Sequence, residues 1–174
     1  MAARLYRAGG FVADDWLLLG DEDAVPDTGR LILPLARFLE LAGAGRSEPR
    51  FAVLVKAHED PQLLAPHLAG LTLVAVAFEK FSDGRGYSTA RLLRQRLGFT
   101  GEVRAVGDVL LDQIPLMRRV GFDSFAVSNE PTIRALEAGH DVDVPLYLQP
   151  SERSDEVPAG ARYWARRPSG AQLS

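Results

Sequence analysis

The stretch that decides the fold spans residues 71–127 and reads LTLVAVAFEKFSDGRGYSTARLLRQRLGFTGEVRAVGDVLLDQIPLMRRVGFDSFAV. Short apolar runs that suit buried strands alternate in it with segments whose apolar residues recur at helical spacing. Together with FAVLV just upstream, these runs predict strands near residues 51–56, 71–78, 102–106 and 122–127. Continuously apolar strands separated by amphipathic helices indicate an α/β fold with a mostly parallel sheet.

Capping residues mark the helices between these strands. Asp60-Pro61 predicts a short helix, because proline suits the first helical position. Residues 87–97 predict a second helix, with Arg91 and Arg94 facing solvent and Gly98 at its end. Two further helices are expected from Asp112 to 120 and from residues 128–129 to 138. The pattern therefore gives about four β-α units, resembling part of a barrel.

The remaining segments are less regular. We expect one domain over residues 1–150, in which residues 1–49 are the less regular part, followed by a polar, loop-like tail over residues 151–174. Within the first part, residues 11–19 predict a short strand, and the apolar stripe of residues 31–41 predicts a helix that starts near Leu33. The exposed edges of a half-barrel favour either a homodimer or a cover formed by the N-terminal segment and the tail.

Composition excludes several classes of chemistry. The chain has 174 residues and no cysteine, so it supplies no disulfide, thiol nucleophile or cysteine-ligated metal. Its three histidines do not stand at metal-ligand spacing, and we expect no metal site. A net charge of −3 argues against a general nucleic-acid surface. No apolar run approaches the length of a membrane span, and no apolar leader begins the chain, so we expect a cytoplasmic protein without a membrane partner.

The loop after the second predicted strand is the main candidate site. In parallel α/β sheets, ligands bind beyond the carboxyl ends of the strands. Here two glycines flank an arginine just before a helix, an arrangement that lets backbone amides and a guanidinium approach an anion. The candidate anion-binding residues are Asp83, Gly84, Arg85, Gly86, Tyr87, Ser88 and, from the third strand, Arg104.

The same loop has a plain structural interpretation, which stays open at this point. Gly84 and Gly86 can form a tight turn in which Arg85 pairs with Asp83 and Ser88 caps the helix. Arg104 can point into a polar pocket or reach solvent at an edge. Further residues at the strand ends complete the candidate pocket: Lys56, Gly107, Asp108, Asp112 and Gln113.

Residues 83–127 resemble a known bacterial family. The matching pieces are DGRGYS (83–88), ARLLR (90–94), RA with GDVL (104–105 and 107–110), DQ (112–113) and GFD (121–123). On these pieces the chain is similar to the bacterial domain-of-unknown-function 934 family, strongly over residues 78–127 and weakly elsewhere. That family is encoded near assimilatory sulfite reductase and is often labelled an oxidoreductase of sulfite reduction.

The resemblance implies an accessory protein or oxidoreductase of bacterial sulfite or sulfate reduction with an arginine-lined oxyanion pocket. Two alternatives stay open: a partial-barrel enzyme acting on a phosphorylated or sulfated small molecule, and a docking module for sulfite reductase without catalysis. The partners expected are a small oxyanion or phosphorylated ligand and sulfite reductase. Neither a catalytic residue nor a cofactor is identified by the sequence, and whether the protein is an enzyme is left open.

Overall fold

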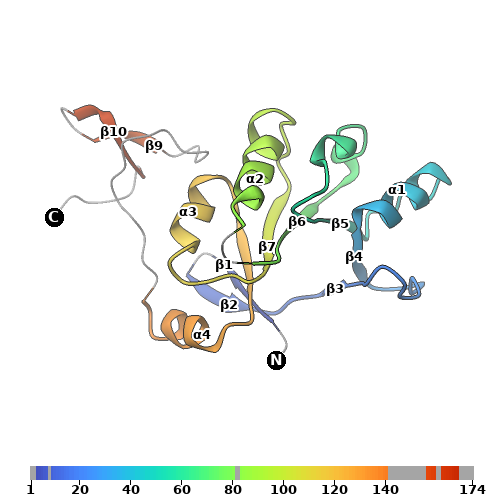
Figure 1. Ribbon diagram of the computed structural model, residues 1–174, viewed down its shortest axis with the longest axis horizontal. Coiled ribbons are helices and arrows are strands. Elements are labelled where there is room, and N and C mark those ends of the chain that lie inside the picture. Colours follow the sequence, from blue (N-terminus) through green and yellow to red (C-terminus); the bar gives the residue numbers. More distant parts are fainter. Residues whose placement is uncertain (1–2, 8, 81–82, 141–155, 160–161, 169–174) are drawn as a thin grey trace.

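The computed structural model describes residues 3–7, 9–80, 83–140, 156–159 and 162–168. Its main sheet has eight strands in the spatial order β2-β1-β8-β7-β6-β5-β4-β3 (Figure 1). The strands of this sheet are β1 (Arg4–Arg7), β2 (Gly10–Val12), β3 (Trp16–Leu18), β4 (Arg30–Pro34), β5 (Phe51–Val55), β6 (Leu73–Phe78), β7 (Glu102–Gly107) and β8 (Ser124–Val127). The helices are α1 (Leu35–Gly43), α2 (Arg85–Gln95), α3 (Ile114–Arg119) and α4 (Glu130–Glu137), with 3-10 turns η1 (Pro61–Leu64) and η2 (Leu68–Gly70).

The sheet is mixed, and it is larger than the four parallel units that the sequence predicts. Strands β3 to β8 run parallel to one another. Strand β1 is antiparallel both to β8 and to the edge strand β2. The four predicted strands are β5 to β8, in the predicted order and direction. The single α/β domain is confirmed, whereas the expectation of four units omitted most of the strands that residues 4–34 add on both sides. The one strand predicted there, over residues 11–19, is wrong as a single strand, because β2 ends at Val12 and β3 begins at Trp16 on the opposite edge.

The N-terminal residues curl the sheet. Strands β2 and β3 form its two opposite edges, yet only residues 13–15 join them. Eight flat strands would place these edges roughly 34 Å apart, at about 4.8 Å per strand. Four peptide steps reach only about 14 Å. The sheet must therefore bend until its edges approach each other, and residues 13–15, which we call the crossing segment, span its concave face.

Apolar side chains fill both faces of the curled sheet. The larger core lies on the convex face, where helices pack on the sheet through residues such as Phe38, Leu93 and Ile133. The concave face holds a smaller cluster of Ile32, Ala52, Leu54, Leu73, Ala75 and Val106, with Trp16 packed against it. Because side chains alternate along a strand, neighbouring residues of β7 point to opposite faces of the sheet.

Two predictions, one for residues 31–41 and one for the tail, need correction. Residues 31–41 form no single helix: Pro34 has an extended backbone (ψ 144°), and the chain changes there from β4 to α1. Pro34 disfavours the helical conformation for the residue before it, so Leu33 stays in the strand. The tail is not entirely loop, because β9 (Glu156–Ala159) and β10 (Arg162–Pro168) pair as an antiparallel ribbon. Residues 141–155 lie outside the described residues.

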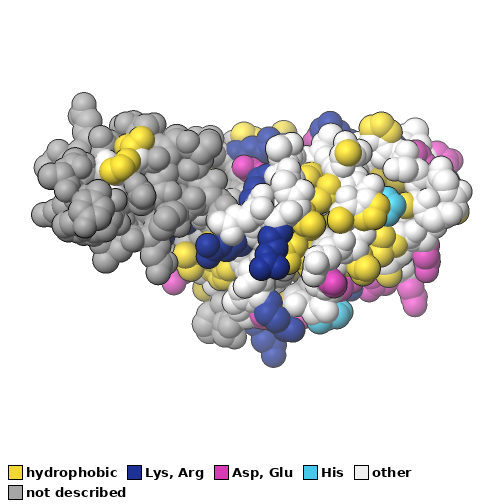
Figure 2. Space-filling view, turned by 90° about the horizontal axis from the view of Figure 1, so that it is seen from above, with side chains coloured by type: hydrophobic (Ala, Val, Ile, Leu, Met, Phe, Trp, Pro, Cys, Tyr) yellow, Lys and Arg dark blue, Asp and Glu magenta, His cyan; other side chains and the backbone are white. Residues whose placement is uncertain are grey.

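The surface carries both charges. Figure 2 shows one face on which Lys and Arg side chains form separate groups beside hydrophobic ones, while acidic side chains gather at the end that holds α1. Among the described residues, no helix is long and apolar enough to cross a membrane.

Candidate functional site

The turn before α2 holds its arginine in a local ion pair. The Asp83 carboxylate accepts hydrogen bonds from the backbone N–H of Arg85 (3.1 Å), from its Nε (2.9 Å) and from its Nη2 (2.6 Å). These bonds and the guanidinium charge lower the pKa of Asp83 to about 2. The Arg85 side chain is 61% exposed. The pairing that the structural interpretation predicted is therefore present, and Ser88 is no cap, because Gly84 precedes the first helical residue.

The second glycine of this turn makes room for packing. A Cβ at Gly86 would lie 2.6 Å from the ring of Phe78 in β6, so only glycine lets α2 approach the strand this closely. Tyr87 stacks edge-on against the same ring, with centroids 5.3 Å apart. Burial raises the pKa of Tyr87, and the charge of Asp112 adds to this.

The other residues predicted at the strand ends do not converge on one point. Lys56 binds Asp21, with Nζ 3.0 Å from Oδ2, and this hydrogen bond raises the pKa of Lys56. Gly107 ends β7 with a φ of +95°, and the backbone N–H of Asp108 donates to Phe78 (2.7 Å). Gln113 accepts from the backbone N–H of Leu110 through Oε1 (3.2 Å). Asp112 lines an apolar groove of about 540 Å³ beside α3, with Leu110, Leu111, Pro115, Leu116, Arg119 and Thr132.

Arg104 lies on the opposite face of the sheet from Arg85. Its neighbours Val103 and Ala105 belong to the convex core beneath the helices, so Arg104 faces the concave side. Arg85 begins α2, which packs on the convex side. The structure thus does not bring Arg85 and Arg104 together. Of the two orientations that the sequence left open for Arg104, the structure has the polar pocket, but Arg104 lies three residues before the end of β7 and not at the carboxyl ends of the strands.

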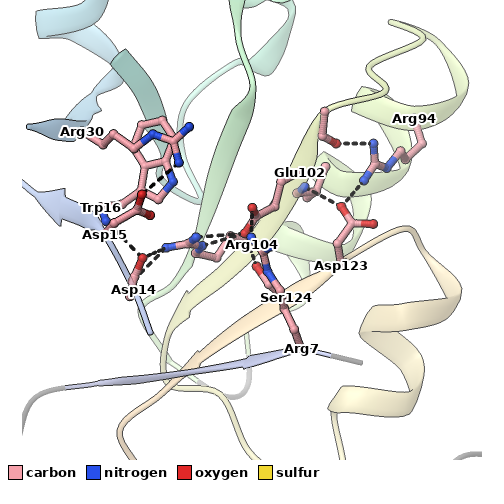
Figure 3. Close-up of polar contacts among 12 residues, drawn as sticks. Arg7, Asp14, Asp15, Trp16, Arg30, Arg94, Glu102, Arg104, Asp123 and Ser124 are labelled. Atoms are coloured by element: carbon pink, nitrogen blue, oxygen red, sulfur yellow. Dashed lines mark hydrogen bonds and ion pairs between the residues drawn. The ribbon is translucent and has the colours of Figure 1, made fainter. Parts of the chain in front are cut away.

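Arg104 is the centre of a charged cluster beneath the crossing segment (Figure 3). Its side chain is 1% exposed. Nη1 donates to both carboxylate oxygens of Asp14 (2.9 Å each), and Nε donates to Oε1 of Glu102 (3.0 Å). Burying a guanidinium is costly unless it is paired, and here Asp14 and Glu102 both pair with it. The cluster therefore fastens the crossing segment to the concave face.

Glu102 connects this cluster to the neighbouring strands. It accepts hydrogen bonds from Ser124 Oγ in β8 (2.6 Å) and from Arg7 Nη2 in β1. Burial opposes the charge of Glu102, but the bonds from Ser124, Arg7 and Arg104, with the charge of Arg104, keep its pKa below the ordinary value. Glu102 is therefore ionised at neutral pH.

A cavity of about 180 Å³ opens beside the cluster. It is lined by Leu5, Arg7, Ala13, Asp15, Trp16, Arg30, Thr72, Leu73, Glu102 and Arg104. Arg30 and Asp15 form a solvent-exposed ion pair of 3.0 Å on its wall, with the Arg30 guanidinium 4.9 Å from the Trp16 ring centroid. Two buried nitrogens of the lining residues, Arg7 Nε and Arg104 Nη2, have no hydrogen-bond partner within the described part of the chain. Arg104 Nη2 lies 2.9 Å from Glu102, but without hydrogen-bond geometry.

Sequence reasoning found one residue of this cavity and missed the others. The spacing of Glu102 and Arg104 was available as a signal, because residues two apart on a strand share a face. Asp14 is 90 positions away from Arg104, and no local pattern connects them. Arg94 was also misjudged as solvent-facing. It donates to the carbonyls of Phe99 (2.6 Å), Gly101 (2.7 Å) and Gly121 (3.0 Å) and is mostly buried.

No group of three or more His, Asp or Glu side chains among the described residues is placed to hold a metal ion. No curated protein matches the chain. The model of the family "Bacterial protein of unknown function (DUF934)" matches residues 52–154, which is more than half of the chain and includes β6, β7, β8 and the turn before α2. The chain therefore belongs to the DUF934 family.

Proposed function

We propose that this protein is an accessory protein of bacterial sulfite or sulfate reduction that binds a small oxyanion in the cavity beneath the crossing segment. The metabolic context comes from the family resemblance of residues 83–127. The binding role is supported by the chemistry of the cavity, whose wall carries three guanidinium groups. Guanidinium groups suit oxyanions because their donors form a planar fork.

The observation that carries this proposal is the pair of unsatisfied donors. A buried N–H without a partner costs roughly 1–3 kcal/mol, so natural structures seldom retain one without a reason. Here two such donors, Arg7 Nε and Arg104 Nη2, belong to residues that line one cavity. Both nitrogens are buried, so an oxyanion in the cavity would accept their hydrogen bonds once the two side chains turn toward it, and bonds to a charged acceptor are stronger than neutral ones.

The size of the cavity favours a small ligand. Sites that hold drug-sized or cofactor-sized molecules measure about 300–1,000 Å³, and this cavity measures about 180 Å³. An ion of four or five heavy atoms fits, whereas a flavin or a dinucleotide does not. We therefore propose that any electron transfer takes place on a partner protein. Sulfite reductase is the partner that the resemblance suggests. Stable co-purification of the two proteins tests that association.

The alternative position for the oxyanion is the turn over residues 83–88. It is the weaker candidate, because the Arg85 guanidinium already donates three hydrogen bonds to the Asp83 carboxylate. The two positions can be separated by a matched pair of variants. Arg30 and Arg85 are both exposed arginines paired with a nearby aspartate, so neither loss should unfold the protein.

Isothermal titration with sulfite, sulfate and phosphate tests the proposal. We expect Arg30→Ala to weaken sulfite binding at least fivefold and Arg85→Ala to leave it unchanged. The reverse order would move the site to residues 83–88. A parent protein that binds none of the three anions would refute oxyanion binding altogether.

A further inference from the structure

We infer that the cavity selects a singly charged oxyanion over a doubly charged one, so that hydrogensulfite, rather than the sulfite or sulfate dianion, is its sulfur ligand. This inference rests on the proposed function. It follows from the charges around the cavity and from the burial of its inner end.

The charged groups around the cavity cancel. Three guanidinium groups, of Arg7, Arg30 and Arg104, meet three carboxylates, of Asp14, Asp15 and Glu102. Each arginine contacts at least one of these carboxylates. The cluster as a whole is therefore neutral, and a bound anion finds hydrogen-bond donors there but no excess positive charge.

A neutral site treats the two charge states of an anion differently. The free energy of removing an ion from water rises with the square of its charge, so a dianion pays about four times the desolvation cost of a monoanion of equal size. The ionised Glu102 carboxylate, bonded to both arginines, adds repulsion that grows with the charge of the ligand.

The exposure of the lining residues sets where this selection acts. Arg30 and Asp15 are solvent-exposed, whereas Arg104 is almost fully buried and Glu102 is largely so. Charges near the exposed pair are screened by water, while those at Arg104 and Glu102 are not. The preference for one charge over two is therefore set mainly by the buried charges of Arg104 and Glu102 and less by the exposed pair.

The test compares nitrate, a monoanion, with sulfate, a dianion, by titration calorimetry in a buffer without chloride. We expect the parent protein to bind nitrate at least tenfold more tightly than sulfate. Glu102→Gln keeps the side-chain shape but gives the cluster a charge of +1, so it should raise sulfate affinity relative to nitrate at least fivefold. Asp15→Asn makes the same change of charge at an exposed position and should shift the ratio in the same direction by a smaller factor, even if Glu102→Gln does not fold.

Asp83→Asn is the control, since it removes one negative charge on the other face of the sheet and should leave the ratio unchanged. A parent protein that prefers sulfate overturns the selectivity while leaving oxyanion binding intact. An unchanged ratio in Asp15→Asn and in folded Glu102→Gln also overturns it. Failure of both anions to bind any variant would instead refute the proposed function.

Discussion

Replacing Asp14 by alanine should destabilise the fold by about 2–3 kcal/mol, while the same change at the next residue, Asp15, should cost under about 1 kcal/mol. Both aspartates lie in the crossing segment and both pair with an arginine. The difference lies in the partner: Asp14 binds Arg104, whose side chain is 1% exposed, whereas Asp15 binds the exposed Arg30.

The magnitude follows from burial. Removing one partner of a fully buried ion pair costs about 3–5 kcal/mol, because the remaining charge stays uncompensated. Arg104 keeps Glu102 as a second partner, and the Asp14 side chain is itself 31% exposed, so water can replace part of what is lost. Both facts lower the expected cost to about 2–3 kcal/mol. The Asp15 pair is solvated on both sides, and such pairs contribute about 0.2–1 kcal/mol.

Urea unfolding followed by far-ultraviolet circular dichroism measures both variants at one pH and one salt concentration. In thermal unfolding, the loss in Asp14→Ala corresponds to a fall in melting temperature of about 5–10 °C for a domain of this size. Equal and small effects of the two substitutions would show that the crossing segment is not fastened to the sheet by Arg104. The account of the concave cluster would then be wrong.

Three further substitutions test other parts of the structure. Arg94→Ala should lower the free energy of unfolding in urea by about 3 kcal/mol, because it removes charged donors from three backbone carbonyls. Arg91→Ala, at an exposed position of the same helix, should lower it by under about 0.5 kcal/mol. Similar values for both would contradict the packing described. Gly86→Ala should cost about 1–3 kcal/mol, because its methyl group would meet an aromatic ring at 2.6 Å, whereas Gly84→Ala, with no atom within 4 Å, should be neutral in the same assay. The lowered pKa of Glu102 means that its ionised form stabilises the fold above its ordinary value of 4.5, and that this contribution is lost as the pH falls through the lower folded value. Glu102→Gln should therefore show a shallower loss of stability between neutral and acid pH than the parent protein, and identical slopes would count against the cluster.

The central strands could be predicted from the sequence because each carries its own local signal. The segments that became β5 and β6 are continuously apolar, those of β7 and β8 are mostly so, and Gly98, Gly121 and Gly139 end helices with the positive φ that glycine tolerates. The N-terminal strands could not be predicted in the same way. Strands β2 and β3 have three residues each, too few for a periodic pattern, and their positions at the two edges depend on the closure of the sheet.

The candidate site shows the same difference between local features, which the sequence predicts, and long-range ones, which it does not. The ion pair of Asp83 with Arg85 is local, and the sequence contains both partners within three residues. The cavity is not local, since it joins residues of β1, the crossing segment, β4 and β7. From the sequence, Arg104 within a strand could either point into a polar pocket or reach solvent at an edge. Which carboxylates pair with it depends on long-range closure that local patterns do not encode.

The most direct test of oxyanion binding beneath the crossing segment is a crystal structure of the protein grown with selenite, in which anomalous scattering locates selenium. The account predicts one selenium peak in the cavity that Arg7, Arg30 and Arg104 line. A peak beside Arg85 in the turn over residues 83–88, or a cavity without selenium at a saturating concentration, would contradict it.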